Sequence, residues 1–152
     1  MNKALAVAVL LLGTLAIGFA TNVSNAPAGT FAGPRVIAKV ALTNQTANIP
    51  TTTILNVPAT GVYRASAYMT QPTVGTIYGA WDLSLSWTDN SGPEAVGLLS
   101  TTQQPPPNDY ATPGAVSVPF TFSAVAGTPV TYEVYGSDGG TYEVYVVIER
   151  LI

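Results

Sequence analysis

The side chains able to do chemistry in this sequence are few. The chain has 152 residues with no cysteine and no histidine, five basic residues and eight carboxylates. It therefore lacks the usual ligands for zinc, haem and iron–sulfur clusters, and it has no thiol nucleophile or imidazole base. Two carboxylates can hydrolyse a glycosidic bond, and Glu133 with Glu143 is one available pair. Because both belong to strand patterns with solvated polar faces, we expect no enzyme activity and no cofactor.

Oxygen donors gather in residues 89–94, which read Asp-Asn-Ser-Gly-Pro-Glu. Carboxylate and amide oxygens are ligands that calcium prefers. The segment lacks the spacing of an EF-hand loop, and Asp-Asn-Ser-Gly is typical of an ordinary turn. We interpret it as a turn and predict no metal site.

The charge balance excludes nucleic acid as a partner. The formal net charge is −3 at pH 7, whereas nucleic-acid binding requires a basic patch. Only 9% of the residues are charged, against about 25% in an average soluble domain. Much of the surface must therefore be uncharged.

Tyrosine gives the strongest signal for recognition, with eight Tyr beside two Trp. Tyrosine is favoured at recognition surfaces because it offers contact area and a polar tip at a small entropic cost. Residues 103–114 (QQPPPNDYATPG) contain three consecutive prolines, which predict a stiff exposed loop. Candidate residues of this loop for recognising a glycan or a surface protein are Gln104, Asn108, Asp109 and Tyr110.

The start of the chain has the composition of an export signal. Lys3 precedes an apolar run over residues 4–20, and small residues occupy the end of that run. We place a signal peptide at residues 1–20, with an uncleaved N-terminal anchor in the membrane as the alternative. Residues 21–34 predict a flexible tether and residues 35–152 a single domain. Both alternatives predict a secreted, cell-surface or periplasmic protein.

Alternating apolar and polar positions dominate the remaining sequence, and helical spacing is absent. The clearest strands are residues 62–69 and 81–88, and further strands are predicted at residues 36–43, 52–57, 95–101, 116–123, 130–135 and 142–152. About eight strands at this spacing predict an all-β antiparallel sandwich. Pro119 places its strand at a sheet edge or a bulge. The expected core includes Tyr63, Ala65, Ala67, Trp81, Leu83, Leu85, Trp87, Val144, Val146 and Ile148.

The pentapeptide Thr-Tyr-Glu-Val-Tyr occurs twice, at residues 131–135 and 141–145. The intervening Gly-Ser-Asp-Gly-Gly can turn at Asp138-Gly139. If the two copies pair, a hairpin would place Tyr135 opposite Tyr142 and Tyr132 opposite Tyr145, as stabilising aromatic pairs.

Two segments resemble a known family. Residues 53–68 contain an apolar strand, a Pro-x-x-Gly turn and the strand opening Gly-Val-Tyr, and residues 141–151 form an apolar closing strand. They resemble the jelly-roll module of TNF/C1q-like proteins, and are similar to small β-domains of phage virion and tail-fibre proteins. A rival is the pre-peptidase C-terminal type of β-sandwich, whose Ala-Gly-Thr-x-Tyr pattern is echoed at residues 126–132. A jelly roll places its last two strands in opposite sheets, which is incompatible with the hairpin.

The jelly-roll resemblance implies a homotrimer and supplies no catalytic residue. On this basis we expect a non-enzymatic structural or oligomerisation module. The alternative is a monomeric glycan- or protein-binding module of the pre-peptidase C-terminal type. In a trimer, outward-facing tyrosines of one sheet and the apolar tail are expected at the contact. These residues are Tyr68, Tyr135, Tyr145, Leu151 and Ile152.

Overall fold

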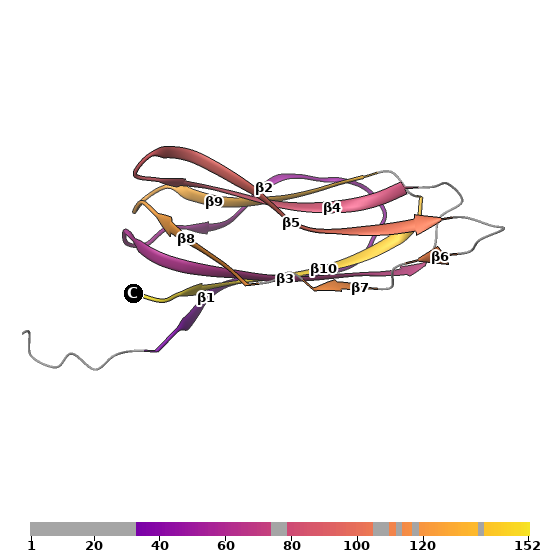
Figure 1. Ribbon diagram of the computed structural model, residues 1–152, viewed down its shortest axis with the longest axis horizontal. Coiled ribbons are helices and arrows are strands. Elements are labelled where there is room, and N and C mark those ends of the chain that lie inside the picture. The colour runs from indigo at the N-terminus through magenta and orange to yellow at the C-terminus, as the bar shows by residue number, and fades with distance from the viewer. Residues whose placement is uncertain (1–32, 74–78, 105–109, 112–113, 117–118, 137–138) are drawn as a thin grey trace, which may run out of the picture. The chain divides into compact units, whose positions relative to one another are not determined.

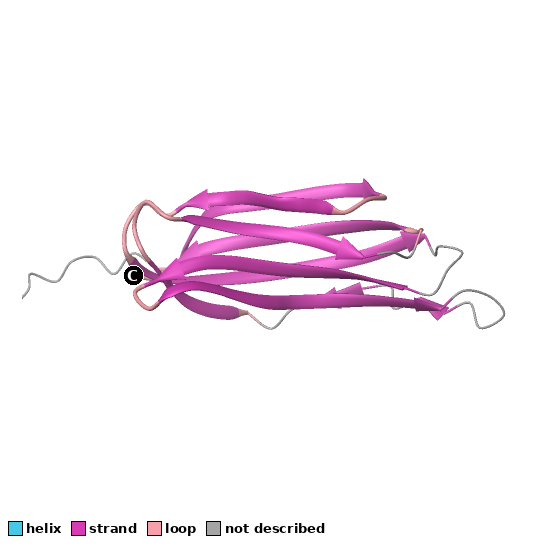
Figure 2. Cartoon of the chain, turned by 90° about the horizontal axis from the view of Figure 1, so that it is seen from above, coloured by secondary structure: helices cyan, strands magenta, loops and turns pink. Residues whose placement is uncertain are grey.

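The computed structural model describes residues 33–73, 79–104, 110–111, 114–116, 119–136 and 139–152. The predicted signal segment and residues 21–32 of the predicted tether lie outside this range. Every helix or strand element among the described residues is a β-strand (Figure 1 and Figure 2). The strands are β1 (Arg35–Gln45), β2 (Ile49–Asn56), β3 (Gly61–Thr73), β4 (Gly79–Asp89), β5 (Gly92–Gln104), β6 (Tyr110–Ala111), β7 (Gly114–Val116), β8 (Phe120–Ala124), β9 (Pro129–Gly136) and β10 (Thr141–Arg150).

The strands form two sheets that lie as two layers (Figure 1). Sheet A has the order β1-β10-β3, and both β7 and β8 pair with the remaining edge of β3. Sheet B has the order β2-β9-β4-β5-β6. All these pairs are antiparallel. The predicted antiparallel β-sandwich is thereby confirmed, since eight of the described strands have five or more residues.

The order of the strands is that of a jelly roll. Successive strands alternate between the sheets over much of the chain, so that β1 and β3 belong to sheet A while β2 and β4 belong to sheet B. The last two strands lie beside the first two, because β10 pairs with β1 and β9 pairs with β2. Two packed sheets joined in this Greek-key manner define the fold.

The two copies of the repeated pentapeptide do not pair, so the hairpin that their pairing would have produced does not form. The first copy lies in β9, between β2 and β4 of sheet B, and the second lies in β10, between β1 and β3 of sheet A. Each copy finds both of its partners far away in the sequence. These long-range pairs replace the local pairing of the two copies, as the jelly-roll resemblance predicted.

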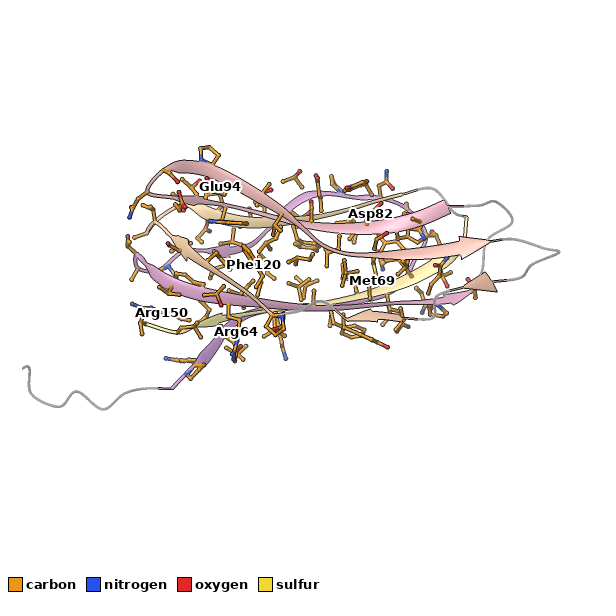
Figure 3. All side chains as sticks on the ribbon, viewed as in Figure 1. Arg64, Met69, Asp82, Glu94, Phe120 and Arg150 are labelled. Carbon is orange, nitrogen blue, oxygen red and sulfur yellow. The ribbon has the colours of Figure 1, made fainter. Side chains whose placement is uncertain are left out.

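The core lies between the two sheets, and all ten residues expected there are buried. Alternation along the strands explains this result, because every second side chain of β3, β4, β9 and β10 points toward the opposite sheet. Figure 3 shows Met69 and Phe120 between the two layers. Buried hydrophobic residues beyond the expected set are Val57, Met69, Phe122, Ala124, Val130, Tyr132, Val134 and Tyr142.

Two predicted strands differ in detail. The strand expected at residues 116–123 is divided into β7 and β8, with Pro119 directly before β8, and both parts lie on an edge of sheet A as the proline predicted. The strand expected at residues 142–152 ends at Arg150 as β10, but residues 151 and 152 continue alongside β3. Leu151 N–H donates to Val62 O at 2.9 Å, and Val62 N–H donates to Ile152 O at 3.3 Å. A side chain at Gly61 would collide with the main-chain oxygen of Ile152.

The sheet edges carry features that discourage pairing with another chain. The edge strand β1 has Lys39 and two register shifts against β10, and β2 has Pro50 near its start. On the other side of sheet B, β5 has Pro93 as its second residue and has a register shift against β4. Prolines, lysines and bulges are the usual protections of exposed edges. Association of this protein is therefore expected to use a face of the sandwich.

Candidate interface on the outer face of sheet A

Two tyrosines meet on the outer face of sheet A. On β3 and β10 the residues that alternate with the core point outward, and Tyr68 is paired with Tyr145 in register. Their ring centroids are 6.1 Å apart, within the usual range for interacting aromatic pairs. Tyr68 is 40% exposed, which is high for a large aromatic side chain in the middle of a sheet.

Uncharged residues extend this pair across the sheet. Ala41 of β1 is the register partner of Tyr145 on its other side, so Ala41, Tyr145 and Tyr68 form a tyrosine row across three strands. The next outward residue of β10 is Val147, which is partly buried and pairs with Ser66. The tyrosine row and Val147 thus form a patch free of charged side chains at the centre of the face.

The hydroxyl of Tyr145 is held by a neighbouring carboxylate. It donates to Glu143 Oε2 at 3.3 Å, and the Thr70 hydroxyl donates to the same oxygen at 3.5 Å. Loss of hydration raises the pKa of Tyr145 above its usual value, and the negative charge of Glu143 acts in the same direction. The phenol therefore stays neutral at physiological pH, which keeps the tyrosine row uncharged.

An ion pair borders the patch. Arg64 Nη2 lies 2.7 Å from Glu149 Oε2, and Arg64 Nε donates to the same oxygen at 2.7 Å. The charges of the outer face cancel, because Lys39 and Arg64 stand against Glu143 and Glu149. Exposed pairs of this kind contribute little to stability, but they remove net charge from a surface.

The outer face of sheet B has a different character. On this face β4 carries Asp82 and β9 carries Glu133, and no basic residue lies in the described strands of this sheet. The remaining polar outward positions of β4 are Ser84, Ser86 and Thr88. Figure 3 shows Asp82 and Glu94 on the upper layer and Arg64 and Arg150 on the lower layer. This separation of charge was missed by the sequence analysis, because it depends on which sheet each strand joins.

The five predicted interface residues fall into three places. Tyr68 and Tyr145 lie together, but Tyr135 is on β9 of sheet B, where it is 49% exposed. The expectation that all three tyrosines share one sheet is therefore wrong. Leu151 and Ile152 follow the end of β10, six or more residues from Tyr145, which is roughly 20 Å along an extended strand. The apolar tail therefore does not lie beside the tyrosines.

The predicted recognition loop is only partly described. The main chains of Gln104 and Tyr110 pair between β5 and β6. Asn108 and Asp109 lie outside the described residues. The expectation of a loop without strands over residues 103–114 is therefore wrong at residues 103–104 and 110–111, and the recognition role of the loop stays a prediction.

The carboxylates singled out in the sequence are occupied in turns and sheets. Glu133 and Glu143 point outward from opposite sheets, so they do not converge on a substrate. Asp89 accepts hydrogen bonds from Ser91 N–H at 2.7 Å, from Gly92 N–H at 3.2 Å and from the Ser91 hydroxyl. These bonds lower the pKa of Asp89 and mark an ordinary turn. In the described part of the chain no three acidic residues gather as metal ligands.

Comparisons with known proteins add a likeness of fold. No protein-family model and no curated protein sequence matches this chain. The solved structures that it resembles include the Eiger TNF from S. frugiperda, with 16% identity and a TM-score of 0.42 over 78% of this chain and 90% of that chain. The strand order described above, and not this likeness, defines the jelly roll. No helix in the described residues is long and apolar enough to span a membrane.

Proposed function

We propose that this protein is a non-enzymatic structural module of the cell exterior that assembles into a homotrimer through the outer face of sheet A. The observation that carries the proposal is the exposed tyrosine row on a face whose charges cancel. Interfaces are enriched in tyrosine and depleted of Lys, Glu and Asp. The number of subunits is taken from the jelly-roll resemblance of the sequence.

The contrast with sheet B supports the choice of face. Two copies that met through their sheet B faces would bring Asp82 and Glu133 of one copy against the same two carboxylates of the other, without a basic residue to compensate them. Like-charge contacts of this kind disfavour wrong partners. Two copies that meet through sheet A bring neutral faces together. The features of the β1, β2 and β5 edges disfavour the other common route, which is the pairing of these edge strands with another copy.

The apolar segment at residues 4–20 supports export, and the absence of Cys and His supports a role without catalysis. In this proposal the protein is delivered outside the cytoplasm and serves as an assembly or spacer unit. Its exposed loops remain available to a glycan or a protein partner.

The test is the mass of the protein in solution, measured by sedimentation equilibrium on protein expressed from the full sequence. We expect three times the mass of one protomer. Tyr145→Asp should shift the assembly to monomers, because it places a charge in a desolvated contact. Tyr135→Asp is the matched control, since it makes the same change in the other copy of the pentapeptide, and the trimer should persist.

Circular dichroism of both variants should retain the strand spectrum, because both side chains point outward. A protomer mass at every concentration would contradict the proposal and favour a monomeric binding module. Equal dissociation by the two variants would show that the contact is not on sheet A.

A further inference from the structure

Two arginines occupy core-facing positions where sheet A ends. The inward side chains of β10 are Tyr142, Val144, Val146 and Ile148, and Arg150 continues that series. Arg150 is the register partner of Tyr63 on β3 and of Arg35 on β1. Directly paired residues point to the same face of a sheet, so both guanidinium groups lie on the core side of the sheet. Figure 3 shows Arg150 at one end of the sandwich, which is the end where Figure 1 marks the C-terminus.

The two arginines have few partners. Arg150 Nε donates to the main-chain oxygen of Ile152 at 3.4 Å, and the side chain of Arg35 has no hydrogen bond or ion pair with any described residue. Arg64 differs, since Glu149 compensates its charge on the opposite face. Like charges placed directly opposite on neighbouring strands are destabilising. A sequence that keeps such a pair departs from local rules, as functional positions often do.

A cleft of about 440 Å³ lies beside these arginines. Its volume is within the roughly 300–1,000 Å³ that is usual for small-molecule sites. The walls combine Arg35 and Arg150 with apolar side chains and with the α-carboxylate that Ile152 carries in protein expressed from this sequence. The other lining residues are Gly33, Ile37, Pro58, Leu151 and Ile152. Ile152 is 72% exposed, the largest value for a bulky apolar residue in the described chain.

We infer that this cleft binds an amphiphilic anion, a carboxylate or phosphate monoester with an apolar chain. The guanidinium groups match such a head group, because their planar donors form paired hydrogen bonds to carboxylate and phosphate oxygens. The anion would also relieve the repulsion between Arg35 and Arg150. Ile37, Pro58, Leu151 and Ile152 would cover the apolar chain. The cleft is on the core side of sheet A and the proposed trimer contact on its outer face, so neither depends on the other.

The test is calorimetric titration of decanoate and of decyl phosphate into protein expressed from the full sequence, with inorganic phosphate and decanol as partial probes. We expect at least one of the two amphiphiles to bind, and the better of them identifies the head group. Inorganic phosphate and decanol should each bind about tenfold more weakly or worse, because each lacks half of the contacts.

Arg35→Gln and Arg150→Gln should each weaken binding of the better amphiphile by about tenfold. Lys39→Gln is the matched control. It removes the same charge from β1, but Lys39 is on the outer face, so affinity should change less than about twofold. Arg35→Lys, which keeps the charge and loses the planar donors, serves if the glutamine variant fails to fold.

Four outcomes would overturn the inference. They are no binding of either amphiphile, equal affinity in the arginine variants and the control, equal affinity for phosphate with and without the chain, and binding of decanol as tight as that of decanoate. Failure of the trimer test would leave these titrations unaffected.

Discussion

The pentapeptide Thr-Tyr-Glu-Val-Tyr occurs in two environments, in β9 of sheet B and in β10 of sheet A. Each copy lies on an inner strand of its sheet, with the second and fourth residues buried and the third and fifth facing outward. The orientation of side chains is therefore the same in β9 and β10. It follows from the alternation of a strand, which is a local property.

The neighbours of the two copies differ. Tyr145 has Tyr68 opposite it, whereas Tyr135 has Asp82 opposite it. One outward tyrosine thus joins an aromatic row and the other stands beside a carboxylate on an acidic sheet. The adjacent strands therefore determine the role of an outward side chain, and the topology of the sheets determines which strands are adjacent.

The largest effect is expected inside the core, where the copies also differ. Tyr142 is fully buried, its ring centroid is 4.4 Å from that of Trp81, and its hydroxyl donates to Ala47 O at 2.7 Å. Tyr132 is 5% exposed, and its hydroxyl has no hydrogen-bond partner among the described residues. We expect Tyr142→Ala to lower the free energy of unfolding by about 4 kcal/mol and Tyr132→Ala by about 3 kcal/mol.

Urea unfolding at one fixed protein concentration measures both losses, since association contributes to apparent stability. An equal loss, or a larger loss for the Tyr132 variant, would contradict the prediction that Tyr142 contributes more to stability than Tyr132.

The two buried tyrosines should also differ in how they affect the free energy of unfolding at alkaline pH. Burial raises the pKa of Tyr142 to about 12, with a contribution from Tyr132, whose own pKa burial also raises. Below pH 10 both phenols are neutral in the folded and unfolded chains, so this stability is fully present. Between pH 10 and about 12 the unfolded chain releases the proton first, and stability is lost as the pH rises.

We therefore expect Tyr142→Phe to flatten the fall of the urea midpoint between pH 10 and about 12, and Tyr132→Phe to flatten it less. Both variants should resemble the unchanged protein in slope below pH 10. A steeper fall in the Tyr142→Phe variant would contradict the sign of the effect.

The sequence predicted what depends on alternation. The buried side chains of β3, β4 and β10 follow from spacing alone, and so does the outward direction of Tyr68 and Tyr145. The spacing of apolar residues does not predict which strands will pair with each other. Tyr135 and Tyr145 have identical local sequences, and their separation into two sheets follows from pairing with β4 and β3, far away in the chain.

The candidate cleft was beyond reach of the sequence for the same reason. Arg35 and Arg150 stand at opposite ends of the domain sequence and meet only because β1 and β10 are neighbours. The register shift between Val36 and Ala38 also had to be known, since without it the pairing of the arginines could not be assigned.

The smallest effect is expected at the outward glutamates of the two copies. Glu133 accepts a hydrogen bond from Thr51 at 2.9 Å and another from Ser84 at 3.1 Å. Its two carboxylate oxygens thus connect β2 and β4 across β9. Glu143 makes longer bonds, 3.3 Å from Tyr145 and 3.5 Å from Thr70. We expect Glu133→Ala to lower the free energy of unfolding by about 1 kcal/mol and Glu143→Ala by a few tenths, about 0.3 kcal/mol.

The charges around the two glutamates reduce the expected difference in stability loss between Glu133→Ala and Glu143→Ala. Removing Glu133 relieves repulsion on the acidic sheet B, whereas removing Glu143 leaves Lys39 and Arg64 in excess on the face of sheet A. Salt screens such exposed charges but not the hydrogen bonds. The gap between the two variants should therefore widen when urea unfolding is repeated at high salt. If the gap between the two variants instead disappears at high salt, charge and not hydrogen bonding distinguishes the two glutamates, and the prediction is wrong.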